Sequence, residues 1–318
     1  MRTTPIFLSL ACSLLAACST TPLPDDFSGK STYDIVRKIR CEARDAVRGK
    51  AVALMLSDPR RTKTYATGLA LRDGRKAFAD LKHSDLDPET VASVSVYEGT
   101  TIGYQFTFDI TETNDESGKL NLGGPLGVNV FSLELSAGGK LKRQNARTFP
   151  VTDNFYDLAI NLNEEYCRGL NDGSNAIYPI IGDIGLSESI DTFIDLNQSG
   201  GLTNLKDKKF KEVTDARTFT TELSMGVTPK VEIKSAANRL KNASFTSSNS
   251  RIDEHKVVIA LSLPIEPAAA APSKGKKAPV PKGTEDATKK RVLEMLNEEN
   301  VRAGYSVLRD LKLKVDAK

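Results

Sequence analysis

The chain has 318 residues, of which 39% are hydrophobic and 27% are charged, and it contains no Trp. This composition is typical of a globular protein and excludes a disordered or fibrous chain. The formal net charge of +3 is an effect of the C-terminal tail, because residues 268–318 contain 12 Lys and Arg against 7 Asp and Glu. The charge therefore indicates no particular partner for the rest of the chain.

The first 18 residues have the features of a secretory signal. Arg2 supplies a short positive segment, residues 5–15 are mostly apolar, and two alanines directly precede Cys18. The sequence Leu-Ala-Ala-Cys at 15–18 resembles the lipobox of bacterial lipoproteins. The resemblance implies that residues 1–17 are removed as a signal peptide and that Cys18 is diacylated on its sulfur. An ordinary signal peptide that is cut near Ala17 is the alternative.

This resemblance also implies a location and a first partner. A lipidated Cys18 anchors the chain to a membrane, because each buried CH₂ group contributes about 0.8 kcal/mol. Ser19 follows the cysteine, whereas an Asp at that position retains the lipoproteins that it resembles in the inner membrane. We therefore expect a protein at the outer membrane that faces the periplasm. Residues 18–31 are rich in Pro, Gly, Ser and Thr, and they read as a lipidated tether.

Two cysteines remain in the mature chain, Cys41 and Cys167. Cys41 lies in a predicted helix at 32–57, where it points away from the apolar face and lies beside Arg44 and Arg48. A lone buried cysteine is not typical of such a position, and the envelope is an oxidising compartment. The sequence therefore predicts a disulfide between Cys41 and Cys167.

The body at 32–263 is predicted to be α+β, with antiparallel sheets packed against two or three helices. Residues 62–151 read as strands, with the clearest alternation at 101–113, polar turns at 114–118 and 137–139, and a strand at 91–98. Residues 153–169 and a segment around 186–194 read as helices, and residues 217–264 return to strands. A weak similarity between 131–149 and 231–245 raises the alternative of two similar halves.

The C-terminal part changes character at Pro264. Residues 264–283 read as a Pro-, Ala- and Lys-rich linker, and residues 284–318 read as a basic helix. Such a tail suits an envelope protein or the carboxylates of peptidoglycan as a partner, with a solvated helix as the plainer alternative. Nucleic acid is excluded as a partner by the expected compartment.

One cluster has a metal-like spacing, formed by His83, Asp85 and Asp87, with Glu89 next in the alternation. We favour a solvated loop before the strand at 91–98 over a metal site. His255 begins an alternating strand and is expected at a sheet edge. The sequence contains neither GxSxG nor HExxH, so we assign no catalytic residue and expect no cofactor.

These features favour a non-catalytic envelope lipoprotein that binds or scaffolds a protein or cell-wall partner at the membrane surface. A periplasmic enzyme of the hydrolase type and a carrier of lipids or small molecules are the alternatives. A polar pocket near His83 would favour the enzyme and a deep apolar cavity the carrier, whereas an exposed apolar patch would favour the scaffold.

Overall fold

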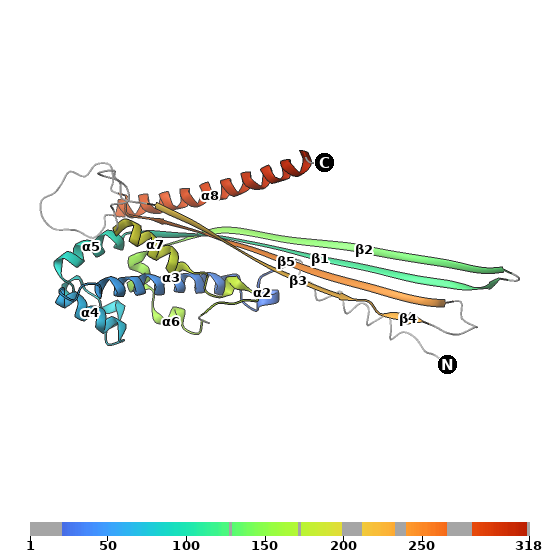
Figure 1. Cartoon of the computed structure of the whole chain (residues 1–318), viewed down its shortest axis with the longest axis horizontal. Helices are drawn as coiled ribbons and strands as arrows, with labels where there is room; N and C mark the ends of the chain where they lie inside the picture. Colours follow the sequence, from blue (N-terminus) through green and yellow to red (C-terminus); the bar gives the residue numbers. More distant parts are fainter. Residues whose placement is uncertain are drawn as a thin grey trace. The chain divides into compact units, whose positions relative to one another are not determined.

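The computed structural model describes residues 21–126, 129–170, 173–198, 212–232, 240–265 and 282–316. The fold is α+β, as predicted (Figure 1). The helices are α2 (Asp25–Ser28), α3 (Thr32–Met55), α4 (Thr62–Arg72), α5 (Pro88–Glu98), α6 (Glu164–Cys167), α7 (Leu186–Gln198) and α8 (Lys282–Asp316). Among the described residues, no helix combines the length and the apolarity that crossing a membrane requires. The signal segment and Cys18 lie outside the described residues.

One antiparallel sheet contains all the described strands. The strands are β1 (Thr101–Leu126), β2 (Asn129–Asn154), β3 (Glu212–Val227), β4 (Lys230–Glu232) and β5 (Leu240–Ser262). Their order is β2-β1-β5-β3, and β4 also pairs with β5. Strands in globular proteins usually have 3–10 residues, so the 26 residues of β1 and of β2 are exceptional.

The chain divides into two compact units, and each is assembled from separate parts of the sequence. The described residues within 1–29, 108–146 and 220–254 form unit 1, and those within 30–107, 147–219 and 255–318 form unit 2. Each long strand therefore contributes residues to both units. The compact units are not consecutive halves of the chain.

Most of the buried apolar side chains lie in unit 2, where the sheet has helices on both faces (Figure 1). The side chains of Ile102, Tyr104 and Phe106 alternate along β1 and are fully buried. On β5, Val257 and Ile259 belong to one face, and Val258 belongs to the other. All three are buried, so both faces of this part of the sheet are covered.

Helix α8 covers one of these faces. Val292, Met295 and Leu296 of α8 form a buried cluster with Val258 and Ala260 of β5. On β1, Gly103 permits the close approach, because a Cβ atom there would lie 2.3 Å from Cγ1 of Val292. The first part of the predicted basic tail is therefore a packed component of unit 2.

Helix α3 begins and ends close to where the sequence predicts. The Ser31 side chain accepts from the backbone of Asp34 at 3.2 Å, and the Asp34 carboxylate accepts from the backbone of Ser31 at 3.2 Å. This capping box satisfies two backbone N–H groups at the start of the helix. The last helical residue is Met55, three positions before Asp58-Pro59.

The strand prediction for residues 62–98 is wrong, because this segment is helical. Pro88 begins α5 at a position where its missing N–H costs nothing. Val91 and Val94 are three residues apart, so a helix places both against the buried cluster of Met55, Leu71 and Leu86. Packing on this cluster outweighs the β-propensity of the valines.

The turns predicted at 114–118 and 137–139 are also wrong, because both segments lie inside continuous strands. The two segments face each other in the ladder. A Cβ atom at Gly138 would lie 3.1 Å from the backbone oxygen of Glu116 and 3.3 Å from Cβ of Ser117. Small residues in one strand thus accommodate the close backbone of the other, and the turn-forming composition does not produce a turn.

The helix predicted at 153–169 is interrupted. β2 continues to Asn154, a π-helical turn covers Asp157–Asn161, and α6 covers only Glu164–Cys167. The side chain of Asn163 accepts from the backbone N–H of Tyr166 at 2.8 Å. Asn side chains compete with helical hydrogen bonds in this way, so a new helix begins here. Asp153, where the predicted helix was to begin, lies in β2 and binds Arg40.

Candidate functional site

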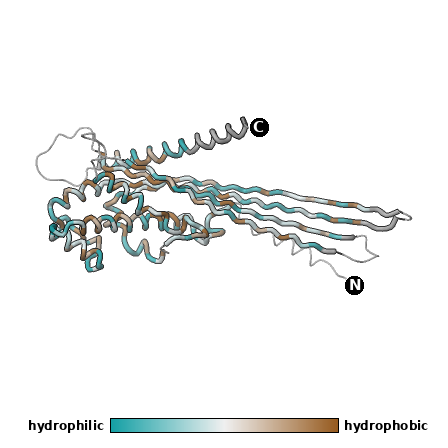
Figure 2. Tube along the Cα trace, in the orientation of Figure 1, coloured by the Kyte–Doolittle hydropathy of each residue, from teal (hydrophilic) through white to brown (hydrophobic). Residues whose placement is uncertain are grey.

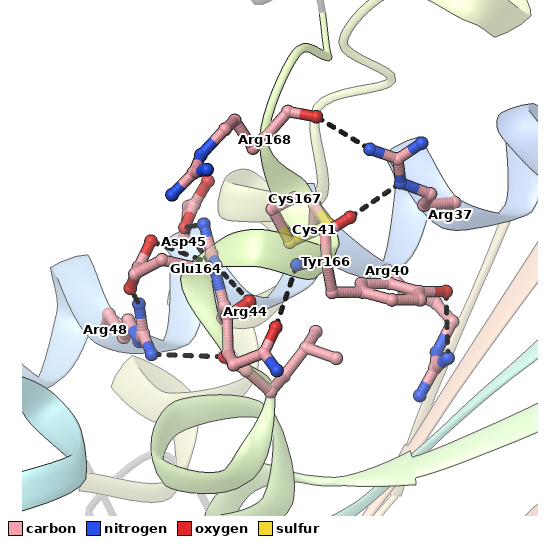
Figure 3. Close-up of a disulfide and its surroundings, with 12 residues drawn as sticks. Arg37, Arg40, Cys41, Arg44, Asp45, Arg48, Glu164, Tyr166, Cys167 and Arg168 are labelled. Carbon is pink, nitrogen blue, oxygen red and sulfur yellow. Dashed lines mark hydrogen bonds and ion pairs between the residues drawn. A yellow bond between two sulfur atoms is a disulfide. The ribbon is translucent and has the colours of Figure 1, made fainter.

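The two cysteines join α3 to α6 in unit 2. The structure pairs Cys41 with Cys167, with 5.7 Å between the two Cα atoms and 126 positions between them in sequence (Figure 3). Cys41 is only 3% exposed, although it lies away from the apolar face of α3. The segment that contains α6 covers this second face, which explains the burial of a cysteine between charged residues.

Four arginines flank the disulfide on the same stripe of α3 and bind the covering segment (Figure 3). Arg37 donates to the carbonyl of Tyr166 at 2.6 Å, and Arg48 donates to the carbonyl of Ala159 at 2.9 Å. The other two are Arg40, which donates to the hydroxyl of Tyr166 at 3.1 Å, and Arg44, which binds Glu164. Arg40 also forms a two-bond ion pair with Asp153 of β2. The hydrogen bond to Asp153 raises the pKa of Arg40. The arginines therefore attach this segment to α3.

The structure does not bring the metal-like residues together. Nε2 of His83 lies 2.6 Å from the carboxylate of Glu98, and Asp85 accepts from Lys76 at 2.8 Å. Hydrogen bonding from Lys76 lowers the pKa of Asp85. Asp87 accepts from the backbone N–H of Thr64 at 3.1 Å, in the first turn of α4. Within the described ranges, no group of three His, Cys, Asp or Glu residues could hold a metal ion.

The sequence predicted that His255 lies at a sheet edge. This prediction is wrong, because β5 is an inner strand of the sheet. The His255 side chain is 1% exposed. Nε2 lies 2.5 Å from the hydroxyl of Tyr178, and the two rings meet edge to face at 5.3 Å. These contacts give the histidine a packing role in the core of unit 2.

The sheet of unit 1 differs from the core because its side chains are widely exposed. Apolar and polar stretches alternate along its strands (Figure 2). Its exposed apolar side chains include several that are about half or more accessible, namely Leu133 (46%), Leu135 (49%), Leu141 (69%), Met225 (66%), Val227 (57%) and Phe245 (47%). Contiguous apolar exposure of this kind marks interaction surfaces.

Part of the segment expected to be a plain tether is attached to this sheet. Arg251 donates to the carbonyl of Leu23 at 2.6 Å, and Asn145 donates to the carbonyl of Pro22 at 2.8 Å. Arg251 also binds Glu112 at 3.0 Å and the buried carboxylate of Asp253 at 2.7 Å. Residues 22–28, which include α2, are therefore folded against unit 1.

Two shallow hollows in the described part of the chain are further candidate sites. The larger, of about 470 Å³, lies on unit 1, and its wall includes Gly118, Gly139, Leu141 and Phe245. The second, of about 210 Å³, lies on unit 2 beside Lys38 and Gly182. His83 lines neither hollow.

Sequence reasoning missed the role of Arg251 and of the segment around Leu23. A signal was available, because Arg251 and Asp253 stand two apart in an alternating strand and so share one face. Their partners come from positions far away in sequence, and no local pattern identifies those partners. The exposed apolar surface of unit 1 was missed because the two predicted turns shortened the strands that carry it.

Comparison with known proteins places the chain in a family. Residues 21–307 match the family described as "Uncharacterised protein y4kA". The chain belongs to the y4kA family. The relative "Uncharacterized protein y4kA" from Sinorhizobium fredii (strain NBRC 101917 / NGR234) is 32% identical over 268 residues, which cover 81% of this chain and 82% of the relative.

Two of the similar solved structures are secretins, and their similarity to this chain is very low. InvG of the Salmonella SPI-1 injectisome NC-base has a TM-score of 0.22 and 8% identity, with 67% of this chain and 72% of that chain covered. The type II secretin XcpQ from Pseudomonas aeruginosa has a TM-score of 0.17 and 8% identity, with 64% and 71% covered. TM-scores of this size carry no inference about this chain.

Proposed function

We propose that this protein is a non-catalytic lipoprotein of the cell envelope that scaffolds a protein partner through the sheet of unit 1. In this proposal Cys18 carries the lipid and anchors the chain to the outer membrane on its periplasmic side. The lipobox resemblance supports the anchor. The observation that supports the scaffold is the edge strand β2, which is 26 residues long and has exposed side chains over most of residues 132–146.

An edge strand of this length is a surface for pairing with another chain. In the order β2-β1-β5-β3, β2 forms one edge of the sheet. Such an edge presents a row of backbone N–H and C=O groups, which a partner strand can pair with. Charged residues protect edges against indiscriminate pairing, and Glu134, Lys140 and Lys142 of β2 are exposed. The edge therefore suits a specific partner.

The alternatives find less support in the described residues. A hydrolase would use histidines or carboxylates that converge in a pocket, whereas His83 contacts Glu98 and His255 contacts Tyr178 in the core. A carrier would use the hollow on unit 1, whose volume of about 470 Å³ suits a small apolar ligand beside Leu141 and Phe245. Binding of such a ligand is the second candidate function.

Part of the basic tail is packed within unit 2, so less of its surface is available to a partner than its composition suggests. Arg291 of α8 binds Glu212 at 2.9 Å, and Val292 and Leu296 are buried. Contact with an envelope protein or with peptidoglycan would use the outer side of α8, where the Lys290 side chain is 80% exposed. This contact remains a proposal that is secondary to the sheet edge.

Two measurements test the proposed function. The first is the mass of the mature N-terminal peptide, together with membrane fractionation of the protein and of Cys18→Ala. Diacylglycerol on Cys18 and release of the variant from outer-membrane fractions are expected. A mature peptide without acyl groups would refute the anchor.

The second measurement is photo-crosslinking in cells with a reactive residue in place of Lys140 on β2. The matched control places the same residue at Lys63, which is exposed on α4 in unit 2. We expect one defined envelope protein, or a second copy of this chain, to be captured from position 140 and not from position 63. Equal capture at both positions, or background at both, would refute the scaffold.

A further inference from the structure

We infer that the far end of the unit 1 sheet lies in the acyl-chain layer of a lipid bilayer. The contact surface is the apolar end, defined as Leu120, Leu122, Leu133, Leu135, Ala243 and Phe245. This inference rests on the proposed function, because the lipid on Cys18 brings the bilayer to the sheet. It goes further by naming the surface of the folded domain that contacts the lipid.

The apolar end belongs to one face of the sheet. Arg143 and Arg251 both bind Glu112 at 3.0 Å, so odd positions of β2 and β5 share a face with even positions of β1. The six residues of the apolar end follow this rule. Leu141 and Phe245 also line the same hollow. All the side chains of the apolar end therefore point to one side.

The opposite face at the same level is polar. The side chain of Asn121 donates to that of Asn242 at 2.5 Å across the strands. Lys119, Glu134 and Ser136 are exposed on this side. A sheet with one apolar and one polar face buries only the apolar face against another phase or protein.

Removing the exposed side chains of the apolar end from water would be energetically favourable. Leu133, Leu135 and Phe245 are 46%, 49% and 47% exposed. Each Å² of apolar surface that leaves water contributes about 25 cal/mol, so covering three such side chains is favourable. Leu120 and Leu122 lie beside them and are half-buried, which makes the apolar surface continuous.

The position of the N-terminal segment indicates that a bilayer would be the surface nearest to the apolar end. Leu23 is bound by Arg251, and Arg251 lies on the same face as the apolar end, six residues from Phe245. These six residues correspond to about 20 Å along the strand. Cys18 is four residues before Pro22, so it lies within about 14 Å of that residue. A lipid on Cys18 can therefore reach the side of the sheet that carries the apolar end.

The charges on this face are placed as a membrane surface requires. Glu112, Arg143, Arg251 and Asp253 form linked ion pairs near Leu23, where polar headgroups would be present. From Gly118 outward, the described residues of this face carry no charge on β1 or β2, and Lys241, near the start of β5, is the charged position on that strand. Unpaired backbone groups are costly in hydrocarbon, so the edge β2 must be paired there. The proposed partner pairs with this same edge.

The test uses the full-length acylated protein in vesicles of phosphatidylethanolamine and phosphatidylglycerol. A single cysteine with an environment-sensitive fluorophore replaces Leu135, and the matched control replaces the adjacent Glu134 on the polar face. Cys41 and Cys167 are joined in a disulfide and do not react. A second pair, Leu122→Cys and Lys119→Cys, repeats the comparison on β1.

We expect lipids with spin labels in their acyl chains to quench the fluorophores at 135 and 122 several-fold more than those at 134 and 119. Iodide, which stays in the water, should quench the fluorophores at 134 and 119 more than those at 135 and 122. Equal access of iodide to all four positions would overturn the inference. Protection of 135 and 122 from both quenchers would also overturn it, because protein would then cover the apolar end. The mass of the Cys18 peptide from the same sample shows separately whether the anchor is present.

Discussion

Arg251 on β5 donates a hydrogen bond of 2.6 Å to the backbone carbonyl of Leu23, which lies 228 positions earlier in the chain. The same guanidinium binds Asp253, whose side chain is 1% exposed. One residue thus attaches the N-terminal segment to the sheet of unit 1 and neutralises a buried carboxylate. In the function proposed above, this attachment limits how far from the sheet a lipid on Cys18 can lie.

Arg251→Ala should detach this segment and destabilise unit 1. Removing one partner of a buried ion pair leaves the other charge without compensation, and the cost is about 3–5 kcal/mol. Hydrogen exchange at the backbone amides of residues 26–28 measures the detachment, and urea unfolding measures the loss of stability. Arg60→Ala is the control, because the Arg60 side chain is 90% exposed, and it should change stability by less than about 0.5 kcal/mol. Unchanged exchange in Arg251→Ala would contradict the attachment.

Removal of the disulfide should destabilise unit 2 strongly. The bridge joins residues 126 positions apart, and closing a loop of this length stabilises the folded state by about 5 kcal/mol in the chain-entropy model. The double variant Cys41→Ala, Cys167→Ala should therefore unfold at much lower urea concentration. Reduction of the natural protein should produce a similar loss, and the variant should not respond to the reductant. Equal midpoints for the oxidised protein and the variant would refute this role.

Gly103→Val should displace α8 from the sheet. A Cβ atom at this position would lie 2.3 Å from Cγ1 of Val292 and 3.0 Å from Cδ1 of Leu296. Overpacking of this kind costs about 1–3 kcal/mol. Gly139→Val is the matched control on a strand, because no atom lies within 4 Å of its Cβ position. Limited proteolysis should cut within α8 faster in Gly103→Val only, and equal rates would count against the packing of α8.

The ion pair between Lys38 and Asp183 should give a specific pH dependence. The two side chains are 2.5 Å apart, and this hydrogen bond from Lys38 lowers the pKa of Asp183 below its usual value of 3.8. A lowered pKa stabilises the folded state above the pKa of the unfolded chain, and the stabilisation is lost as the pH falls through the folded value. The free energy of unfolding should therefore exceed that of Asp183→Asn at pH 6, and the difference should shrink below about pH 4. A difference that is constant between pH 6 and pH 3 would contradict this assignment.

Local signals predicted several elements well. The helix predicted at 32–57 corresponds closely to α3, which covers Thr32–Met55. The alternation at 101–113 predicted the first half of β1 because its apolar side chains share one face and are buried in the core. The spacing of Leu186, Ile190 and Phe193 predicted α7, whose apolar side chains are buried. In each case the local pattern and the tertiary environment agree.

The errors arose where long-range contacts outweigh local propensity. Val91 and Val94 have strand propensity, but α5 forms because the helix places both on the cluster that contains Met55. The glycines at 138 and 139 suggested a turn, but they pair with Glu116 and Ser117 in a ladder. Neither partner lies within a local sequence window.

The sequence by itself determined the α+β class, the ends of α3, the pair of cysteines left for a bridge, and the signal that points to an anchor. Those features depend on neighbouring residues or on simple counting. Only the tertiary structure decided that β1 and β2 continue through the two predicted turns, that Leu23 binds Arg251, and that α8 packs on Gly103. These features depend on backbone pairing and close packing between distant segments, whose energies exceed the small local preferences of a single strand or turn.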